Sequence, residues 1–84
     1  MRVRAAAELG AEHLRAVVEH HLAVHERTLA TYREIEARDF PGGDSDVRSA
    51  LLHLVLRHGI ETEEASARWC REILEVVDGA ALRR

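Results

Sequence analysis

The chain of 84 residues is interrupted once, at Asp39-Phe40-Pro41-Gly42-Gly43-Asp44, and this break limits the folds available to it. Proline and paired glycines stop a helix. The flanking segments are rich in Ala, Glu, Arg and Leu, and their apolar residues recur about every 3.6 positions. We therefore predict an all-α fold, an antiparallel hairpin of two long helices. The single helical domain of residues 1–84 divides into a helix over 5–38, a loop over 39–45, a helix over 46–78 and a tail over 79–84.

The second predicted helix contains a glycine whose effect can be interpreted in two ways. His58-Gly59-Ile60 resembles a helix C-cap, and Thr62 could then begin a third helix. Alternatively, the helix continues through Gly59, because the apolar residues keep one helical phase on both sides of it. We favour the continuous helix, with Gly79 as its stop. Asp44, Ser45 or Asp46 is suited to cap its start.

Each predicted helix carries one apolar stripe. In the first helix, at about 100° per residue, the stripe consists of Leu14, Val18, Leu22, Leu29 and Tyr32, widened by Val17, Val24 and Ile35. In the second it consists of Leu51, Val55, Trp69, Ile73 and Val76, widened by Leu52, Cys70 and Val77. Two such helices leave much of their stripes uncovered, and a core of this size is marginal. We expect a four-helix-bundle homodimer or a higher homo-oligomer.

Polar side chains interrupt both stripes at one height. A turn near residue 42 places His25 level with His58 and Gly59, and His21 level with Thr62. His21 and His25 stand four positions apart, a spacing that lets two imidazoles bind one metal ion from a single helix. The sequence thus suggests a site for iron, manganese or zinc in a small metal-binding bundle protein with a storage or redox role. Its predicted ligands are His21, His25, His58 and Glu61, with Glu63 as a rival for the carboxylate.

The same histidines permit a second interpretation from a different class of function. They could form a structural or pH-sensitive layer, hydrogen-bonded to Thr28, Thr62 or Ser66, in a non-enzymatic oligomerisation or protein-interaction module. The other histidines, His13, His20 and His53, are predicted to be surface residues.

Composition narrows the remaining classes. The net charge is −3 and no basic stripe with interleaved aromatics is visible, which argues against a nucleic-acid partner. Cys70 is the only cysteine, so it is expected to be a small core residue. No membrane-spanning run or targeting segment is recognisable, and a cytoplasmic location without membrane contact is expected. No combination of residues predicts a particular catalysed reaction.

The segment Glu34-Ile35-Glu36-Ala37-Arg38-Asp39-Phe40, followed by a short loop and a helix containing Glu61-Thr62-Glu63-Glu64, resembles encapsulated ferritins over about residues 18–77. Those two-helix proteins dimerise into a di-iron ferroxidase and assemble into rings inside encapsulin shells. The resemblance implies that Glu34 and Glu64 are metal ligands. Ala67 stands where that family has a ligand histidine.

Overall fold

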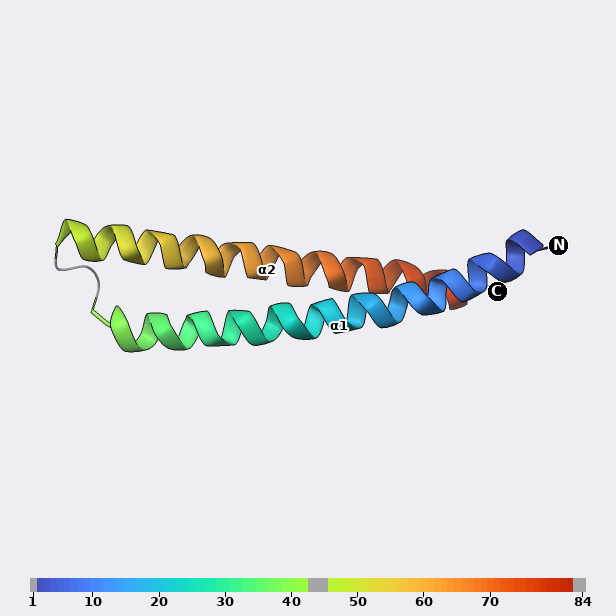
Figure 1. Cartoon of the computed structure of the whole chain (residues 1–84), viewed down its shortest axis with the longest axis horizontal. Helices are drawn as coiled ribbons and strands as arrows, with labels where there is room; N and C mark the ends of the chain where they lie inside the picture. The colour runs from blue at the N-terminus through green and yellow to red at the C-terminus, as the bar shows by residue number, and fades with distance from the viewer. Residues whose placement is uncertain (1, 43–45, 83–84) are drawn as a thin grey trace.

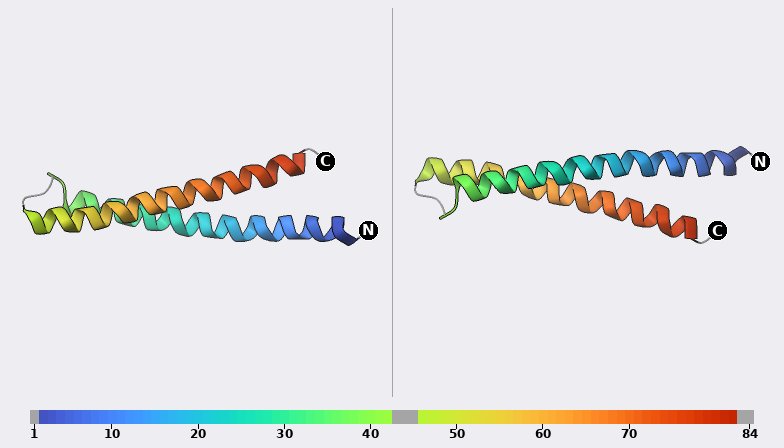
Figure 2. Two further views of the ribbon diagram at one scale, coloured as in Figure 1. Left: turned by 90° about the horizontal axis from the view of Figure 1, so that it is seen from above. Right: turned by 90° about the horizontal axis from the view of Figure 1, so that it is seen from below.

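The computed structural model describes residues 2–42 and 46–82, and the side chains of 10–42 and 46–79. Two helices, α1 (Arg2–Asp39) and α2 (Val47–Leu82), form an antiparallel hairpin. The start of α1 and the end of α2 lie at the same end of the hairpin, and the first turns of α1 extend past the end of α2 (Figure 1). Near the turn, the two helices are seen apart in Figure 1 and overlap in Figure 2, whereas near the termini they overlap in Figure 1 and are seen apart in Figure 2. The two views differ by a quarter turn about the long axis, so the helices wind around each other. The molecule measures 65 × 18 × 15 Å.

Local sequence explains where the helices end. The amide of Phe40 still donates to the carbonyl of Glu36 at 2.9 Å, but Pro41 has no amide hydrogen to continue the ladder. Asp46 caps α2, because its Oδ1 accepts from the Ser49 amide at 2.8 Å and its carbonyl accepts from the Ala50 amide. The alternative caps, Asp44 and Ser45, lie outside the described residues.

The second helix is continuous through Gly59, as the helical phase indicated. A Cβ at this position would lie 3.0 Å from Cε2 of Tyr32, which packs against the bare backbone. Gly59 therefore allows close approach of the two helices instead of dividing α2. At Gly79, where we expected a stop, the helix continues to Leu82, and residues 83–84 of the predicted tail lie outside the described part of the chain.

The helices meet along a seam of buried and half-buried residues that recur at alternating steps of four and three. This spacing is typical of an antiparallel coiled coil. On α1 the seam comprises Ala11, Arg15, Val18, Leu22, His25, Leu29, Tyr32 and Glu36. On α2 it comprises Ser49, His53, Leu56, Ile60, Glu63, Ala67, Cys70, Leu74 and Val77. Among the described side chains, the buried apolar ones are Val18, Leu29, Ile60, Ala67 and Cys70.

The predicted stripe of α2 is largely wrong as the inner face of the hairpin. Leu51, Val55, Trp69 and Val76 are 58–72% exposed, and Cys70 is buried in their place. The apolar sector of α2 is wider than one neighbouring helix can cover, and the sequence pattern does not tell which half of that sector turns inward. The predicted stripe of α1 agrees better with the structure. Its members Val18, Leu22, Leu29 and Tyr32 lie on the seam, and Leu14 is exposed, by 45%.

Within the described ranges 2–42 and 46–82, neither helix contains a segment long and apolar enough to cross a membrane.

Candidate functional site

The central polar contact of the hairpin joins His25 of α1 to Glu63 of α2. Nδ1 of His25 lies 2.5 Å from Oε2 of Glu63, and the two side chains are 28% and 18% exposed. The sequence predicted that His25 lies level with His58 and Gly59 of α2. In the structure His25 instead meets Glu63, so the register of the two helices differs from the predicted register by about one helical turn. The partner of His25 is therefore a carboxylate. Thr28, one of the predicted hydroxyl partners, donates instead to the carbonyl of Val24 on its own helix at 2.9 Å.

His21 lies one turn before His25, beside the seam, and is exposed. The two imidazole rings stack with their centroids 6.4 Å apart and their planes at 28°. His20, the residue before His21, is also exposed, and its ring meets the His21 ring edge-on with the centroids 6.0 Å apart. The structure thus keeps His21 and His25 as neighbours.

His58 and Glu61 occupy exposed positions of α2 outside the seam. Among the described residues, no three His, Cys, Asp or Glu side chains gather closely enough to hold a metal ion. The hairpin therefore does not bring His58 and Glu61 to His21 and His25. The carboxylate that meets the pair is Glu63.

A second histidine–carboxylate contact lies near the turn. Nε2 of His53 is 2.8 Å from Oε2 of Glu36. The His53 ring also stacks on the ring of Phe40, with the two centroids 4.6 Å apart and the planes at 9° to each other. The His53 side chain is only 16% exposed, so its prediction as a surface residue is wrong. Its spacing from Leu56 and Ile60, three and seven positions later, is the signal that would have placed it on the seam.

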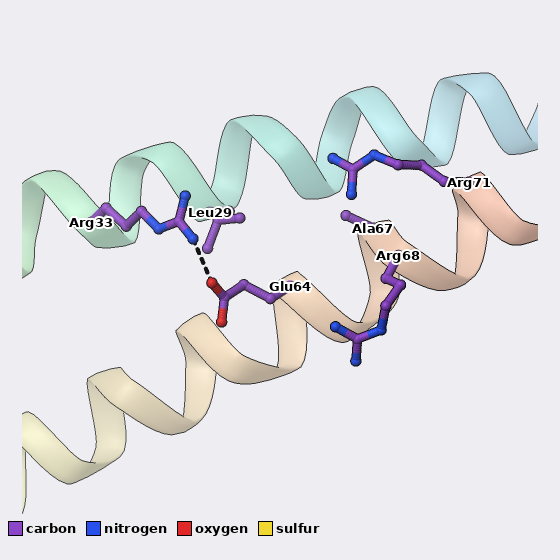
Figure 3. A pocket seen from close by; sticks show the side chains of 6 residues that line it. All are labelled: Leu29, Arg33, Glu64, Ala67, Arg68 and Arg71. Carbon is purple, nitrogen blue, oxygen red and sulfur yellow. Dashed lines mark hydrogen bonds and ion pairs between the residues drawn. The ribbon is translucent and has the colours of Figure 1, made fainter.

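One long side of the hairpin, the charged face, carries ion pairs between the helices. Arg71 donates to Glu26 at 2.8 Å, Arg33 pairs with Glu64, and Arg15 pairs with Asp78 near the termini. An open groove of about 380 Å³ lies on this face. Figure 3 shows the side chains that line it: Leu29, Arg33, Glu64, Ala67, Arg68 and Arg71. Exposed pairs of this kind contribute little to stability, because water and salt screen the charges. Their main effect is to favour one register and one solvent-facing side.

The opposite long side of the hairpin is apolar. Because Glu26 and Arg33 flank the seam on the charged face, the residues that flank it on the other side share a second surface. Its large members are exposed by 37–72%. We call this surface the apolar face: Leu14, Val17 and Val24 of α1, with Leu52, Val55, Trp69 and Val76 of α2. Several large apolar side chains exposed on one side of a small protein are typical of an interaction site.

The middle of the apolar face is small and polar on both helices. His21 and Thr28 of α1 lie there beside Gly59, Thr62 and Ser66 of α2, and larger apolar residues lie toward both ends. Of the polar residues that the sequence placed at one height, His21 and Thr62 lie on this surface, whereas His25 lies on the seam and His58 is exposed elsewhere on α2.

Comparison with protein families identifies the class of this hairpin. Residues 1–78 match the model of the family described as virulence activator alpha C-term. The chain belongs to this family, since the match covers more than nine-tenths of its 84 residues. The comparisons with curated proteins and with solved structures found no match.

This result overturns the resemblance to encapsulated ferritins. The two glutamates that the resemblance implied as ligands lie apart from any shared site: Glu64 pairs with Arg33 on the charged face, and Glu34 is exposed on α1. Short Glu- and Ala-containing motifs arise readily in solvated helices of this composition, and they carried the resemblance without the chemistry.

Proposed function

We propose that this chain is a helical association module that pairs with a second copy of itself through the apolar face. The observation that carries the proposal is the exposure of Trp69, at 63%, on a surface that also contains Val55 and Val76. Large aromatic residues on an apolar surface are typical anchors of protein interfaces. The opposite side of the hairpin is occupied by ion pairs, which leaves one side for association.

The arrangement of residue sizes along α2 favours a second copy as the partner. Small or polar residues at 59, 62 and 66 lie between Leu52 and Val55 on one side and Trp69 and Val76 on the other. If two copies of α2 cross antiparallel, each apolar end meets an apolar end, and Trp69 meets the small residues near Gly59. Such self-complementarity is required of a two-fold symmetric interface. The product is a four-helix bundle.

The family description supports a role of this kind, because it names the C-terminal part of an activator. A paired hairpin would hold two copies of an activator chain together without catalysing a reaction.

The mass of the protein in solution tests the proposal. Sedimentation equilibrium of the wild-type chain should give twice the chain mass of 9.5 kDa. Trp69→Glu places a charge in the apolar face and should yield the monomer. Leu54→Glu is the matched control, because Leu54 is 57% exposed but lies on the side of α2 away from the apolar face. A wild-type monomer at high concentration, or equal effects of the two variants, would refute the proposal.

A further inference from the structure

We infer that His21 and His25 form a two-histidine binding site for a divalent transition-metal ion such as Zn²⁺. They are the only histidines of the chain that stand four positions apart. In the structure their ring centroids lie 6.4 Å apart, with 28° between the ring planes, and turning the exposed ring of His21 would bring a nitrogen of each ring toward one ion. Two imidazoles on adjacent turns can share one ion, because a zinc–nitrogen bond of about 2.0–2.1 Å places each ring close to it. The inference goes beyond the association proposed above.

Glu63 prepares His25 for this role. An ionised carboxylate can only accept a hydrogen bond, so Nδ1 of His25, 2.5 Å from Oε2 of Glu63, must donate the proton. In the neutral ring Nε2 then carries the free lone pair. Metal-binding histidines in proteins are held in the same way, with the second ring nitrogen donating to a carboxylate. Glu63 is thus a positioning residue for the ion.

The site that follows differs from the four-ligand set predicted from the sequence. His58 and Glu61 take no part, since both are exposed on other sides of α2. Among the side chains that the structure describes, those of 10–42 and 46–79, no third ligand joins the pair, so water completes the coordination of the ion. His20 meets His21 edge-on at 6.0 Å, one position away, and stays outside the stacked pair. Two nitrogen ligands suit zinc, copper or nickel better than calcium or magnesium.

Titration with ZnCl₂, followed by isothermal calorimetry in a buffer that does not chelate zinc, tests the inference. The wild-type chain should bind one zinc ion per chain. His21→Ala should weaken binding at least about tenfold, the effect typical of disrupting even the outer shell of a metal site. His58→Ala is the matched control, because His58 is exposed as His21 is. This variant should bind zinc as the wild type does, since His58 is not a ligand of the proposed site. Equal affinities of the wild type and His21→Ala would overturn the site.

The role of Glu63 requires its own pair of variants. Glu63→Ala should weaken zinc binding roughly 10–100-fold, whereas Glu63→Gln retains an oxygen that accepts from Nδ1 and should recover part of the loss. Nitrogen chemical shifts of His25 would report the loss of the Nδ1-protonated form in Glu63→Ala alone. If Glu63→Ala binds zinc as tightly as the wild type, Glu63 does not position His25.

The association-deficient variant Trp69→Glu separates this inference from the proposed function. His21, His25 and Glu63 belong to one hairpin, so the monomer should still bind zinc, and His21→Ala should weaken that binding in the monomer too. Loss of zinc binding in that monomer, with helicity retained by circular dichroism, would overturn a site contained within one hairpin. Loss of dimerisation alone would leave the metal inference intact.

Discussion

Gly59 is the residue at which sequence and packing conflict most directly. Glycine in a helix interior costs about 1 kcal/mol relative to alanine, yet α2 passes through it without a break. The reason is the ring of Tyr32, whose Cε2 and Cδ2 would lie 3.0 and 3.3 Å from a Cβ at this position. The helical phase was sufficient to predict continuity. The reason for the glycine could not be predicted, because it depends on a side chain of the other helix.

Two glycine substitutions should therefore have different effects on stability. Gly10→Ala adds a Cβ that meets nothing within 4 Å, and we expect it to raise the free energy of unfolding by about 0.5–1 kcal/mol. Gly59→Ala must displace the Tyr32 ring, so it should raise the free energy of unfolding by less than Gly10→Ala does, or lower it. Urea unfolding followed by circular dichroism, at one protein concentration, measures both. Equal gains at the two positions would show that the Tyr32 contact does not constrain residue 59.

At the scale of the helices, the ends of α1 and α2 that flank the turn were more predictable than the register of the two helices, whereas α2 runs past the stop expected at Gly79. Pro41 and the capping Asp46 are local signals, and they place the turn from sequence alone. The register depends on which side chains meet across the seam. His25 pairs with Glu63, about a turn further along α2 than symmetry around the turn indicates. For this reason the sequence identified His21 and His25 as neighbours but selected His58 and Glu61 in place of Glu63.

The end of α1 gives a prediction about pH. Arg38 donates to Asp39 from Nε at 2.9 Å and from Nη2 at 3.2 Å, and this hydrogen bonding lowers the pKa of Asp39 below its ordinary value of 3.8. A lowered pKa in the folded state stabilises the fold above pH 3.8, and the contribution disappears as the pH falls through the folded value. Both side chains are exposed, Arg38 by 72% and Asp39 by 46%, so the effect on stability is small.

The titration of Asp39 itself is the sensitive measurement. Carboxyl carbon shifts should give a midpoint below 3.8 for the wild type, and Arg38→Ala should raise it to that value or higher. The helix dipole adds to the increase, because Asp39 is the last residue of α1 and a negative charge is unfavourable there. An unchanged midpoint in the variant would mean that Arg38 does not hold the carboxylate in solution.

At the scale of the whole molecule, the division into a charged face and an apolar face is the property most relevant to function. The sequence predicted that the hairpin exposes apolar surface, since two helices cannot cover wide stripes. The sequence could not show which apolar residues of α2 form that surface, because Trp69 and Cys70 are adjacent in the chain and both belong to the apolar sector of the helix. Only the packing shows that Cys70 is buried at 3% exposure and that Trp69 remains outside at 63%.

The small core has a consequence for the stability of the whole molecule. Its buried apolar members among the described residues are two aliphatic side chains of α1, Val18 and Leu29, with Ile60, Ala67 and Cys70 of α2. A core of this size is marginal for a chain of 84 residues. Burial of the apolar face in a second copy would then provide much of the stability, and folding would be coupled to association.

Coupling of this kind makes the unfolding temperature depend on protein concentration. Mass action over a hundredfold range in concentration corresponds to about 2.7 kcal/mol, so the unfolding temperature should rise on the order of 5–10 °C. Circular dichroism at the two ends of the range measures the shift. Trp69→Glu should unfold at a lower temperature that no longer changes with concentration, and Leu54→Glu should retain the dependence. If the wild-type unfolding temperature is the same throughout, the hairpin is stable alone and its apolar face serves a partner other than itself.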